Sequence, residues 1–239
     1  GVSVRYVSSV QELGQPDMIF LPGSKNTMGD LRWMRQNGLE TAVKKLAVHI
    51  PVWGICGGYQ MLGRTISDPH GVENENSLCE PLRGMELIDT DTTLMPEKMR
   101  TQTRGKFENV TGIFSTLSGL EFSGYEIHMG KTTVSTGEHQ MPLVQLADGR
   151  TDGVQRMEKG SEAPGVYGSY VHGIFDDGDI AVRIVQALAD KKRVSWKPEA
   201  GGDYHAFKEQ QYDKLAQGLR EHLDMEYVYS ILQESRISS

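Results

Sequence analysis

The sequence of 239 residues contains only two cysteines, Cys56 and Cys79. Two thiols cannot build a framework of several disulfides, and they are too few for a zinc site with four cysteine ligands. We therefore expect no disulfide-stabilised scaffold and no metal site. A reducing compartment, the cytoplasm, suits a chain whose important thiol is free.

The sequence also has no long hydrophobic run and no excess of positive charge. No apolar segment approaches the roughly 20 residues that span a bilayer, and we expect no signal peptide. The formal net charge is −7, from 25 basic and 32 acidic residues. This charge disfavours non-specific binding to nucleic acid or to an anionic membrane surface. We therefore expect neither among the partners.

Two further features concern completeness. No run fits the pattern G-x-x-x-x-G-K-[ST], the loop that binds the phosphates of ATP in many nucleoside triphosphatases. We therefore expect no ATP site of that kind in these residues. The chain begins with Gly1, and the alternation of residues 2–7 predicts a strand at once. We therefore expect these residues to be part of a longer polypeptide.

The chemistry that is present centres on Cys56. Residues 52–55 predict a short buried strand, and residues 59–62 predict the first turn of a helix. Gly54 and Gly58 flank the cysteine in a G-x-C-x-G pattern, the counterpart of the serine elbow of hydrolases. Backbone N–H groups at the helix start would stabilise an oxyanion and favour the thiolate. A buried cysteine in a glycine-rich turn is an equally good reading of the pattern alone.

The elements before the cysteine predict an α/β fold. Residues 18–21 form an apolar strand, and a helix follows with Thr27 as N-cap and Asp30 in the capping-box position. A second helix begins after Gly38, and the strand that carries Cys56 comes next. This order indicates an open, mostly parallel sheet flanked by helices, with the active loops at the carboxyl ends of the strands. Residues 22–24 and the cysteine should therefore face one pocket.

The later part of the chain changes character. Residues 67–154 predict an antiparallel insertion, with strands at 123–130 and 141–144. Residues 165–171 predict one strand ending in His172, where a general base for the cysteine would stand, although a turn histidine is the alternative. An amphipathic helix follows at 179–189. We expect an α/β domain over 1–195, then a linker and a helical region over 196–239 that packs on it.

Together these runs resemble the class I, or triad-type, glutamine amidotransferase domains, in their cobalamin-pathway branch. Within that branch the similarity is to the glutaminase domains of the cobyric acid synthase family. The elbow alone indicates only the broad class, whereas P-G-S-K-N-T and Y-E-I-H-M-G are more specific. The runs that carry the resemblance are residues 21–27 with 30–31, 54–63, 68–69 with 71–73, 124–130 and 170–176.

The resemblance implies a flavodoxin-like fold, with a truncated first strand, and a role for each matching residue. The thiolate of Cys56 would attack the side-chain amide of glutamine, and His172 would carry the proton to the departing ammonia. The N–H groups of Gly57 and of the Gly23–Ser24 loop would form the oxyanion hole. Gln60 would help to hold the substrate glutamine.

One position departs from the triad pattern. Classical members carry a glutamate two residues after the catalytic histidine, and this sequence has Ile174 there. The cobalamin branch is similar in this respect. Glu126 and Asp176 are the nearest candidates for an orienting acid, and the role of His128 is open.

The family also implies partners outside these residues. A synthetase domain of the same polypeptide, with ATP and magnesium, would use the ammonia to amidate carboxylates of a corrin. We expect no cofactor in the present residues themselves. The long helical region at the C-terminus could dock on that synthetase domain.

Other readings remain. A sibling is the glutaminase of an a,c-diamide synthase or of a Mur-ligase-like amidating complex, but residues 22–27 favour the cobyric acid synthase type. A cysteine-elbow hydrolase of the peptidase or deglycase kind would not require Gln60 or the run 172–176. A non-catalytic interaction domain is disfavoured by the intact Cys56 and His172.

Overall fold

The computed structural model describes residues 2–73, 80–135, 139–157, 165–176, 178–198 and 204–237. Cys79 therefore lies outside the described residues. The chain divides into two compact units, Gly1–Pro198 and Glu199–Ser239. The first contains all the strands of the described ranges and all the residues discussed above as candidates for the site.

Three parallel strands form the centre of the first unit. They are β1 (Ile19–Leu21), β2 (Val52–Ile55) and β9 (Val166–Ser169), with β2 in the middle. Val52 and Trp53 point to opposite faces of the sheet and are both fully buried. This explains the continuous apolar run of β2, because a strand covered on both faces has no solvent-facing positions.

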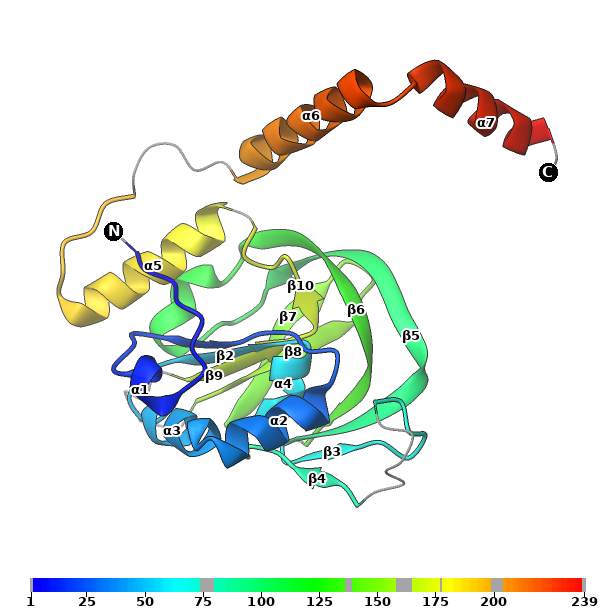
Figure 1. The fold of residues 1–239 in the computed structure, drawn as a ribbon. Coiled ribbons are helices and arrows are strands. Elements are labelled where there is room, and N and C mark those ends of the chain that lie inside the picture. Colours follow the sequence, from blue (N-terminus) through cyan, green and yellow to red (C-terminus); the bar gives the residue numbers. More distant parts are fainter. Residues whose placement is uncertain are drawn as a thin grey trace. The chain divides into compact units, whose positions relative to one another are not determined.

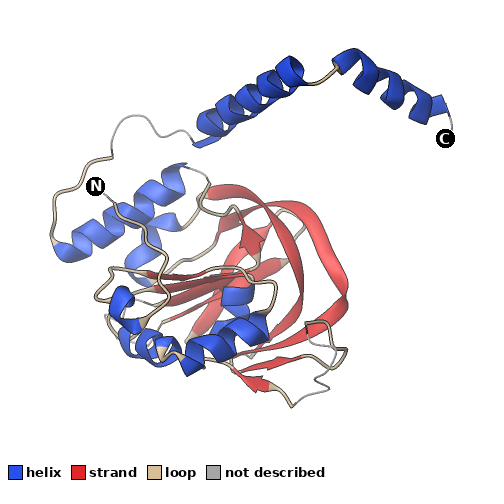
Figure 2. Ribbon diagram, in the orientation of Figure 1, coloured by secondary structure: helices blue, strands red, loops and turns tan. Residues whose placement is uncertain are grey.

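Helices cover the two faces of these strands (Figures 1 and 2). One face packs against α2 (Thr27–Gln36), α3 (Leu39–Leu46) and α4 (Gly57–Leu62). The other packs against η1 (Gly112–Leu117) and α5 (Gly178–Lys192). The predicted α/β class is thus confirmed, including the break between two helices at Gly38, whose left-handed φ of 77° starts α3.

Antiparallel strands occupy most of the chain between β2 and β9. They include β4 (Leu82–Arg83), β5 (Thr90–Phe107), β6 (Glu121–Val134), β7 (Gln140–Leu146) and β8 (Thr151–Arg156). The antiparallel insertion is therefore present. The short strand β3 (Thr65–Ser67) pairs parallel with β5 and antiparallel with β4.

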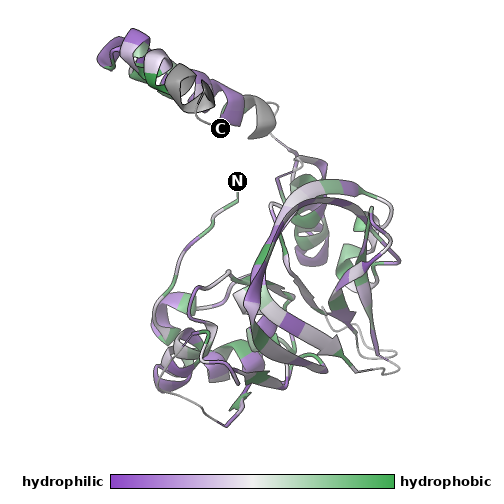
Figure 3. Cartoon of the chain, turned by 90° about the vertical axis from the view of Figure 1, so that its right-hand side faces the viewer, coloured by the Kyte–Doolittle hydropathy of each residue, from purple (hydrophilic) through white to green (hydrophobic). Residues whose placement is uncertain are grey.

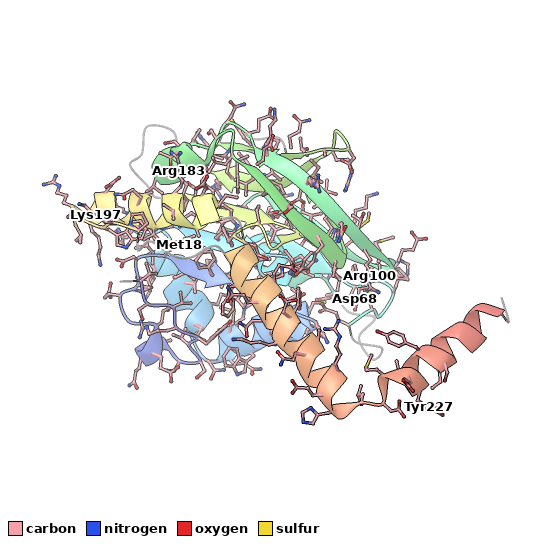
Figure 4. All side chains as sticks on the ribbon, turned by 90° about the horizontal axis from the view of Figure 1, so that it is seen from above. Met18, Asp68, Arg100, Arg183, Lys197 and Tyr227 are labelled. Carbon is pink, nitrogen blue, oxygen red and sulfur yellow. The ribbon has the colours of Figure 1, made fainter. Side chains whose placement is uncertain are left out.

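The long strands β5 and β6 curve round the molecule (Figure 1). Together with β7, β8, β9 and β10 (Val171–His172) they form a closed arrangement of antiparallel pairs, here called the antiparallel ring. β5 pairs with both β6 and β7, β7 pairs with β8, and β8 pairs with β9. The chain then passes from β9 into β10, which pairs with β6. Residues 96–102 in the middle of β5 are exposed, among them Arg100, which Figure 4 labels. Hydrophilic and hydrophobic residues both occur along the long strands (Figure 3).

Two local predictions were wrong. Residues 2–7 form no strand, and Val4 and Tyr6 are exposed, because alternation stabilises a strand only where a neighbouring strand supplies hydrogen bonds. A short helix, α1 (Val10–Leu13), follows instead. The N-cap of α2 is Asn26 rather than Thr27, since the Asn26 side chain accepts a hydrogen bond from Gly29 N.

The strand predicted over 165–171 is also not continuous. It breaks at Tyr170 into β9, which pairs with β2 and β8, and β10, which pairs with β6. The histidine therefore leaves the parallel sheet and joins the antiparallel ring. The predicted helix at 179–189 is confirmed within α5.

The second unit consists of two helices, α6 (Tyr204–His222) and α7 (Met225–Ile237). A helical region was predicted here. Its large apolar side chains, among them Phe207, Tyr212, Leu215 and Leu219, are exposed. They were expected to serve as core or docking residues, and this expectation stays a prediction.

Candidate active site

Cys56 stands at a strained turn between β2 and α4. It is the N-cap of α4 with φ 51° and ψ −109°, a region that non-glycine residues rarely occupy. The turn is tight, because a Cβ on Gly54 would lie 2.6 Å from the backbone of Gly58. A Cβ on Gly58 would in turn overlap the carbonyl of Leu21. The two glycines of the G-x-C-x-G pattern are therefore required by the close approach of α4 to the sheet.

The cysteine itself is enclosed. Cys56 is 7% exposed, and its Sγ lies 3.6 Å from the carbonyl oxygen of Ile127 on β6. Its backbone N–H donates to Ser169 O at 2.9 Å, which fixes the turn to the end of β9. The nucleophile is thus held between the parallel sheet and the antiparallel ring.

The protonation state of Cys56 differs from the prediction. Burial raises the pKa of the thiol to about 11, and the charges of Asp152 and Glu73 act in the same direction. The N–H of Gly57 at the helix start lowers the pKa, as predicted, but it does not outweigh burial. The cysteine is therefore a neutral thiol that requires a base.

His172 is brought beside the cysteine by β10. Its backbone pairs with Tyr125 of β6, and the two rings stack with centroids 6.0 Å apart. A Cβ on Gly23 would lie 3.1 Å from His172 Cε1 and 3.6 Å from the Cβ of Cys56. The three segments therefore meet at the loop after β1, which leaves no room for a larger residue at position 23.

The electrostatics of His172 suit a base. Burial lowers its pKa, and the neighbouring His128 adds to this effect, while a hydrogen bond with the backbone of Ile127 opposes it. The imidazole is therefore neutral at neutral pH. It can accept the proton of a thiol that does not ionise by itself.

The residues expected to form the oxyanion hole lie together. A Cβ on Gly57 would be 2.8 Å from Ser24 N, so the start of α4 and the loop after β1 approach at van der Waals distance. The first N–H groups of a helix have no partner within it. The hydroxyl of Ser24 points elsewhere, donating to Asp30. The structure thus gives Asp30 a role in fixing the loop, not the predicted role in a capping box.

Gln60 lies in the first turns of α4 and is 3% exposed. Its Oε1 accepts a hydrogen bond from Thr27 Oγ1 at 3.1 Å, and its Nε2 donates to Tyr170 OH at 3.3 Å. One amide hydrogen is left over. The side chain therefore ties α2 to the chain break before β10.

The two candidate acids occupy different environments. Glu126 is 2% exposed, and its carboxylate accepts hydrogen bonds from Arg150 at 3.2 and 2.7 Å. Its Oε1 also lies 3.7 Å from His128 Nε2. His128 and Arg150 lower the pKa of Glu126 to about 2 although burial raises it. Asp176 lies in the turn that begins at Gly173, where Asp176 N donates to Gly173 O.

Arg150 was not predicted as a residue of this region, because its only signal in the sequence is its place in a D-G-R turn. Also not predicted was the backbone carbonyl of Ile127, which contacts both catalytic candidates and leaves no trace in a sequence. His128 stacks on the ring of Tyr170, with centroids 3.8 Å apart, and its Nδ1 bonds to Gly130 O. This gives the histidine a structural place beside the site.

Residues 1–180 match the model of the CobB/CobQ-like glutamine amidotransferase domain. The chain belongs to this family. Two relatives, both cobyric acid synthases, support the assignment. One, from Ruminiclostridium cellulolyticum, is 48% identical over 238 residues, which are 97% of this chain and 44% of that protein. The other, from Lachnoclostridium phytofermentans, is 40% identical over 238 residues, covering 98% and 46%.

This glutamine amidotransferase domain spans less than half the length of these curated relatives. Among solved structures, PurLQS from Thermotoga maritima is similar with a TM-score of 0.54 and 16% identity, over 79% of this chain and 85% of that one. At this identity the likeness concerns the fold alone.

Two further acidic residues, Glu73 and Asp68, hold the local structure beside the site through hydrogen bonds. The carboxylate of Glu73 accepts hydrogen bonds from the N–H groups of Thr27 and Met28, both at 2.8 Å, and so caps the start of α2. Asp68 holds the loop in place by accepting from Val72 N and Glu73 N. The run 68–73 thus fixes the helix that follows the Gly23–Ser24 loop.

No cluster of three or more histidine, cysteine, aspartate or glutamate residues with the geometry of a metal site occurs in the described part of the chain. None of the helices in the described ranges combines the length and the apolar character that a membrane span requires. A hollow of about 160 Å³ adjoins the site and is lined by Tyr59, Thr132, Asp152 and Tyr170, among others.

Proposed function

We propose that this domain hydrolyses glutamine through a thioester on Cys56 and supplies the ammonia to a cobyric acid synthase. The observation that carries the proposal is the meeting of Cys56, His172 and the Gly23–Ser24 loop at one point. A thiol, a neutral imidazole and backbone N–H groups are the parts that acyl transfer from an amide requires.

The first half of the reaction forms the thioester. His172 takes the proton of Cys56 as the sulfur attacks the side-chain carbonyl carbon of glutamine. The resulting oxyanion accepts hydrogen bonds from the N–H groups of Gly57 and Ser24. When the C–N bond breaks, the proton moves from the imidazolium to the leaving nitrogen, which departs as ammonia. The acyl group remains on the sulfur.

The second half returns the enzyme to its starting state. A water molecule gives its proton to His172 as its oxygen attacks the thioester carbon. The C–S bond then breaks, the sulfur recovers the proton, and glutamate leaves. The Ile127 carbonyl and the pairing of β10 with β6 hold the imidazole in place during both halves.

Recognition of the substrate glutamine involves Gln60 through the packing that it maintains. Its contacts with Thr27 and Tyr170 hold α2 and the chain before β10 in place. We expect Gln60→Ala to raise KM more than it lowers kcat.

The use of the ammonia belongs to the rest of the polypeptide. The named relatives are cobyric acid synthases that extend well beyond the matched region. We assign to that other half the binding of ATP with magnesium, which would activate carboxylates of a corrin for amidation. The proposed turnover requires reduced Cys56, and on this ground we assign the reaction to the reducing cytoplasm.

The test uses a diazo-ketone analogue of glutamine and mass spectrometry of the 239-residue chain, with Cys56→Ala as control. We expect one adduct, on Cys56, that excess glutamine prevents. The intact polypeptide is examined in parallel, so that a pocket completed by the other half is detected. Absence of the adduct from both would overturn the proposal.

A further inference from the structure

The break between β9 and β10 is made by a side chain of β8. In the pairing of β8 with β9, Val154 lies opposite Gly168 and Arg156 opposite Val166. Two residues further along, Asp152 therefore reaches the position of Tyr170. There the side chain of Asp152, and not its backbone carbonyl, bonds to the opposite strand: Asp152 Oδ2 accepts a hydrogen bond from Tyr170 N at 3.0 Å. The backbone ladder ends at this point.

Ser169 shares the same carboxylate oxygen. Its hydroxyl donates to Asp152 Oδ2 at 2.6 Å and accepts from Val171 N at 3.0 Å. Two successive N–H groups of the chain break are thus satisfied by side chains rather than by a neighbouring strand. This frees the chain to turn towards β6, where the next residue, His172, pairs with Tyr125.

The same serine also holds the nucleophile. Its carbonyl accepts the N–H of Cys56 at 2.9 Å, while its hydroxyl fixes the peptide that leads to His172. Ser169 is fully buried. The backbone of β8 lies close against it, because a Cβ on Gly153 would be 3.1 Å from its Cα and its Cβ. A small displacement of Ser169 is therefore transmitted to both halves of the catalytic pair.

We infer that Asp152 and Ser169 are positioning residues that set the relative placement of Cys56 and His172. The inference rests on the proposed glutaminase function for its catalytic consequence. The hydrogen bonds described for the two side chains go to each other and to the backbone, so through these bonds they act on the backbone that they hold. The charge of Asp152 also raises the pKa of the Cys56 thiol, and Asp152→Asn removes that charge while keeping the hydrogen bonds.

The variants separate hydrogen bonding from charge. In Asp152→Asn one amide oxygen can still accept both hydrogen bonds that Oδ2 accepts now, whereas Asp152→Ala and Ser169→Ala remove them. The matched control is Gln155→Ala on the same strand. Gln155 is buried and bonds to Thr111, Asn109 and Pro142, so its loss destabilises β8 without touching the chain break.

The first measurement is glutamate release at varied glutamine concentration. We expect Asp152→Ala and Ser169→Ala to lower kcat by about 10- to 100-fold with little change in KM, since misplacement of reacting groups costs rate rather than binding. Asp152→Asn should retain kcat within about threefold. Gln155→Ala should leave kcat unchanged for the folded protein. Equal losses of kcat in all four variants, or none in Asp152→Ala, would overturn the inference.

The second measurement is amide hydrogen exchange, which needs no activity. We expect faster exchange at Tyr170, Val171 and His172 in Asp152→Ala, and not in Gln155→Ala. Unchanged exchange there would overturn the positioning role even in an active enzyme. If the unmodified chain and the intact polypeptide both release no glutamate, the proposed function fails, while the exchange data still decide whether Asp152 fixes the chain break.

Discussion

The two halves of the active site are held by different kinds of structure. Cys56 sits in a turn whose geometry is dictated by glycines two residues away on each side. His172 is placed by strand pairing with β6, which lies far away in the sequence. The proposed nucleophile is thus fixed by its immediate neighbours in the sequence, and the proposed base is fixed by long-range contacts. This difference explains why the sequence predicts the turn at Cys56 in detail, but predicts His172 without the strand break that places it.

Changing the glycines that flank Cys56 should destabilise the whole fold of the first unit. In Gly58→Ala the new Cβ would overlap the carbonyl of Leu21, which belongs to the central strand β1. We expect the free energy of unfolding to fall by about 3 kcal/mol or more, because neither backbone can move without disrupting the core. Urea denaturation followed by circular dichroism measures this.

Gly119→Ala is the control for that variant. Nothing lies within 4 Å of a Cβ there, although φ is 83°. Only the backbone strain remains, so the loss should be about 1 kcal/mol. Equal losses in the two variants would show that the packing of α4 on β1 is not what requires Gly58.

Changing the glycine of β6 that faces His172 should disturb the placement of this histidine more than the stability of the fold. A Cβ on Gly124 would overlap the carbonyl of His172 and push β10 away from β6. Since β10 has only two residues, we expect Gly124→Ala to lower kcat by about 10- to 100-fold while the unfolding free energy changes far less than in Gly58→Ala. Parallel measurement of glutamate release and urea denaturation decides this. A full loss of folding in Gly124→Ala would remove the distinction between the two halves.

The difference also explains what the sequence could predict. Cys56, Gly54, Gly58 and the strand–turn–helix around them are contiguous, so composition and spacing were sufficient. The loop at Gly23 and Ser24 followed from the rule that parallel strands end at one edge. The chain break at Tyr170 could not be predicted, because it depends on Asp152 in a different strand. The pKa of Cys56 was predicted in the wrong direction, since burial depends on the curved strands β5 and β6.

Removing the ion pair between Arg150 and Glu126 should have a smaller effect on stability than changing Gly58. Arg150→Ala leaves the buried carboxylate of Glu126 without its bidentate partner. We expect a loss of about 2 kcal/mol at pH 7, less than for a fully buried pair because the arginine side chain is 47% exposed. Arg64→Ala is the control, since both side chains of its pair with Asp91 are 42% exposed and the pair should contribute less than the pair of Arg150 with Glu126.

The sign of the pH dependence follows from the lowered pKa of Glu126, about 2 in the folded chain. A carboxylate with a depressed pKa stabilises the fold above its unfolded pKa of about 4.3, and this contribution is lost as the pH falls from there towards 2. Urea denaturation at pH 7 and pH 3 should therefore show a smaller difference in Arg150→Ala than in the unmodified chain. An identical difference in both would mean that Arg150 does not hold this carboxylate in its charged form.

The smallest effect concerns the electrostatic coupling of the two histidines. His172 must be neutral to accept the thiol proton, and its pKa is lowered by burial and by His128. The acid limb of kcat/KM for glutamine hydrolysis should therefore lie below the ordinary histidine value of about 6.5. With the pKa of Cys56 at about 11, no limb from the thiol is expected near neutral pH. His128→Gln should move the acid limb upward, towards the ordinary value, because the electrostatic effect by which His128 lowers the pKa of His172 is lost. A limb above 6.5 in the unmodified chain would show that the base half is more open to solvent than the pairing of β10 with β6 allows.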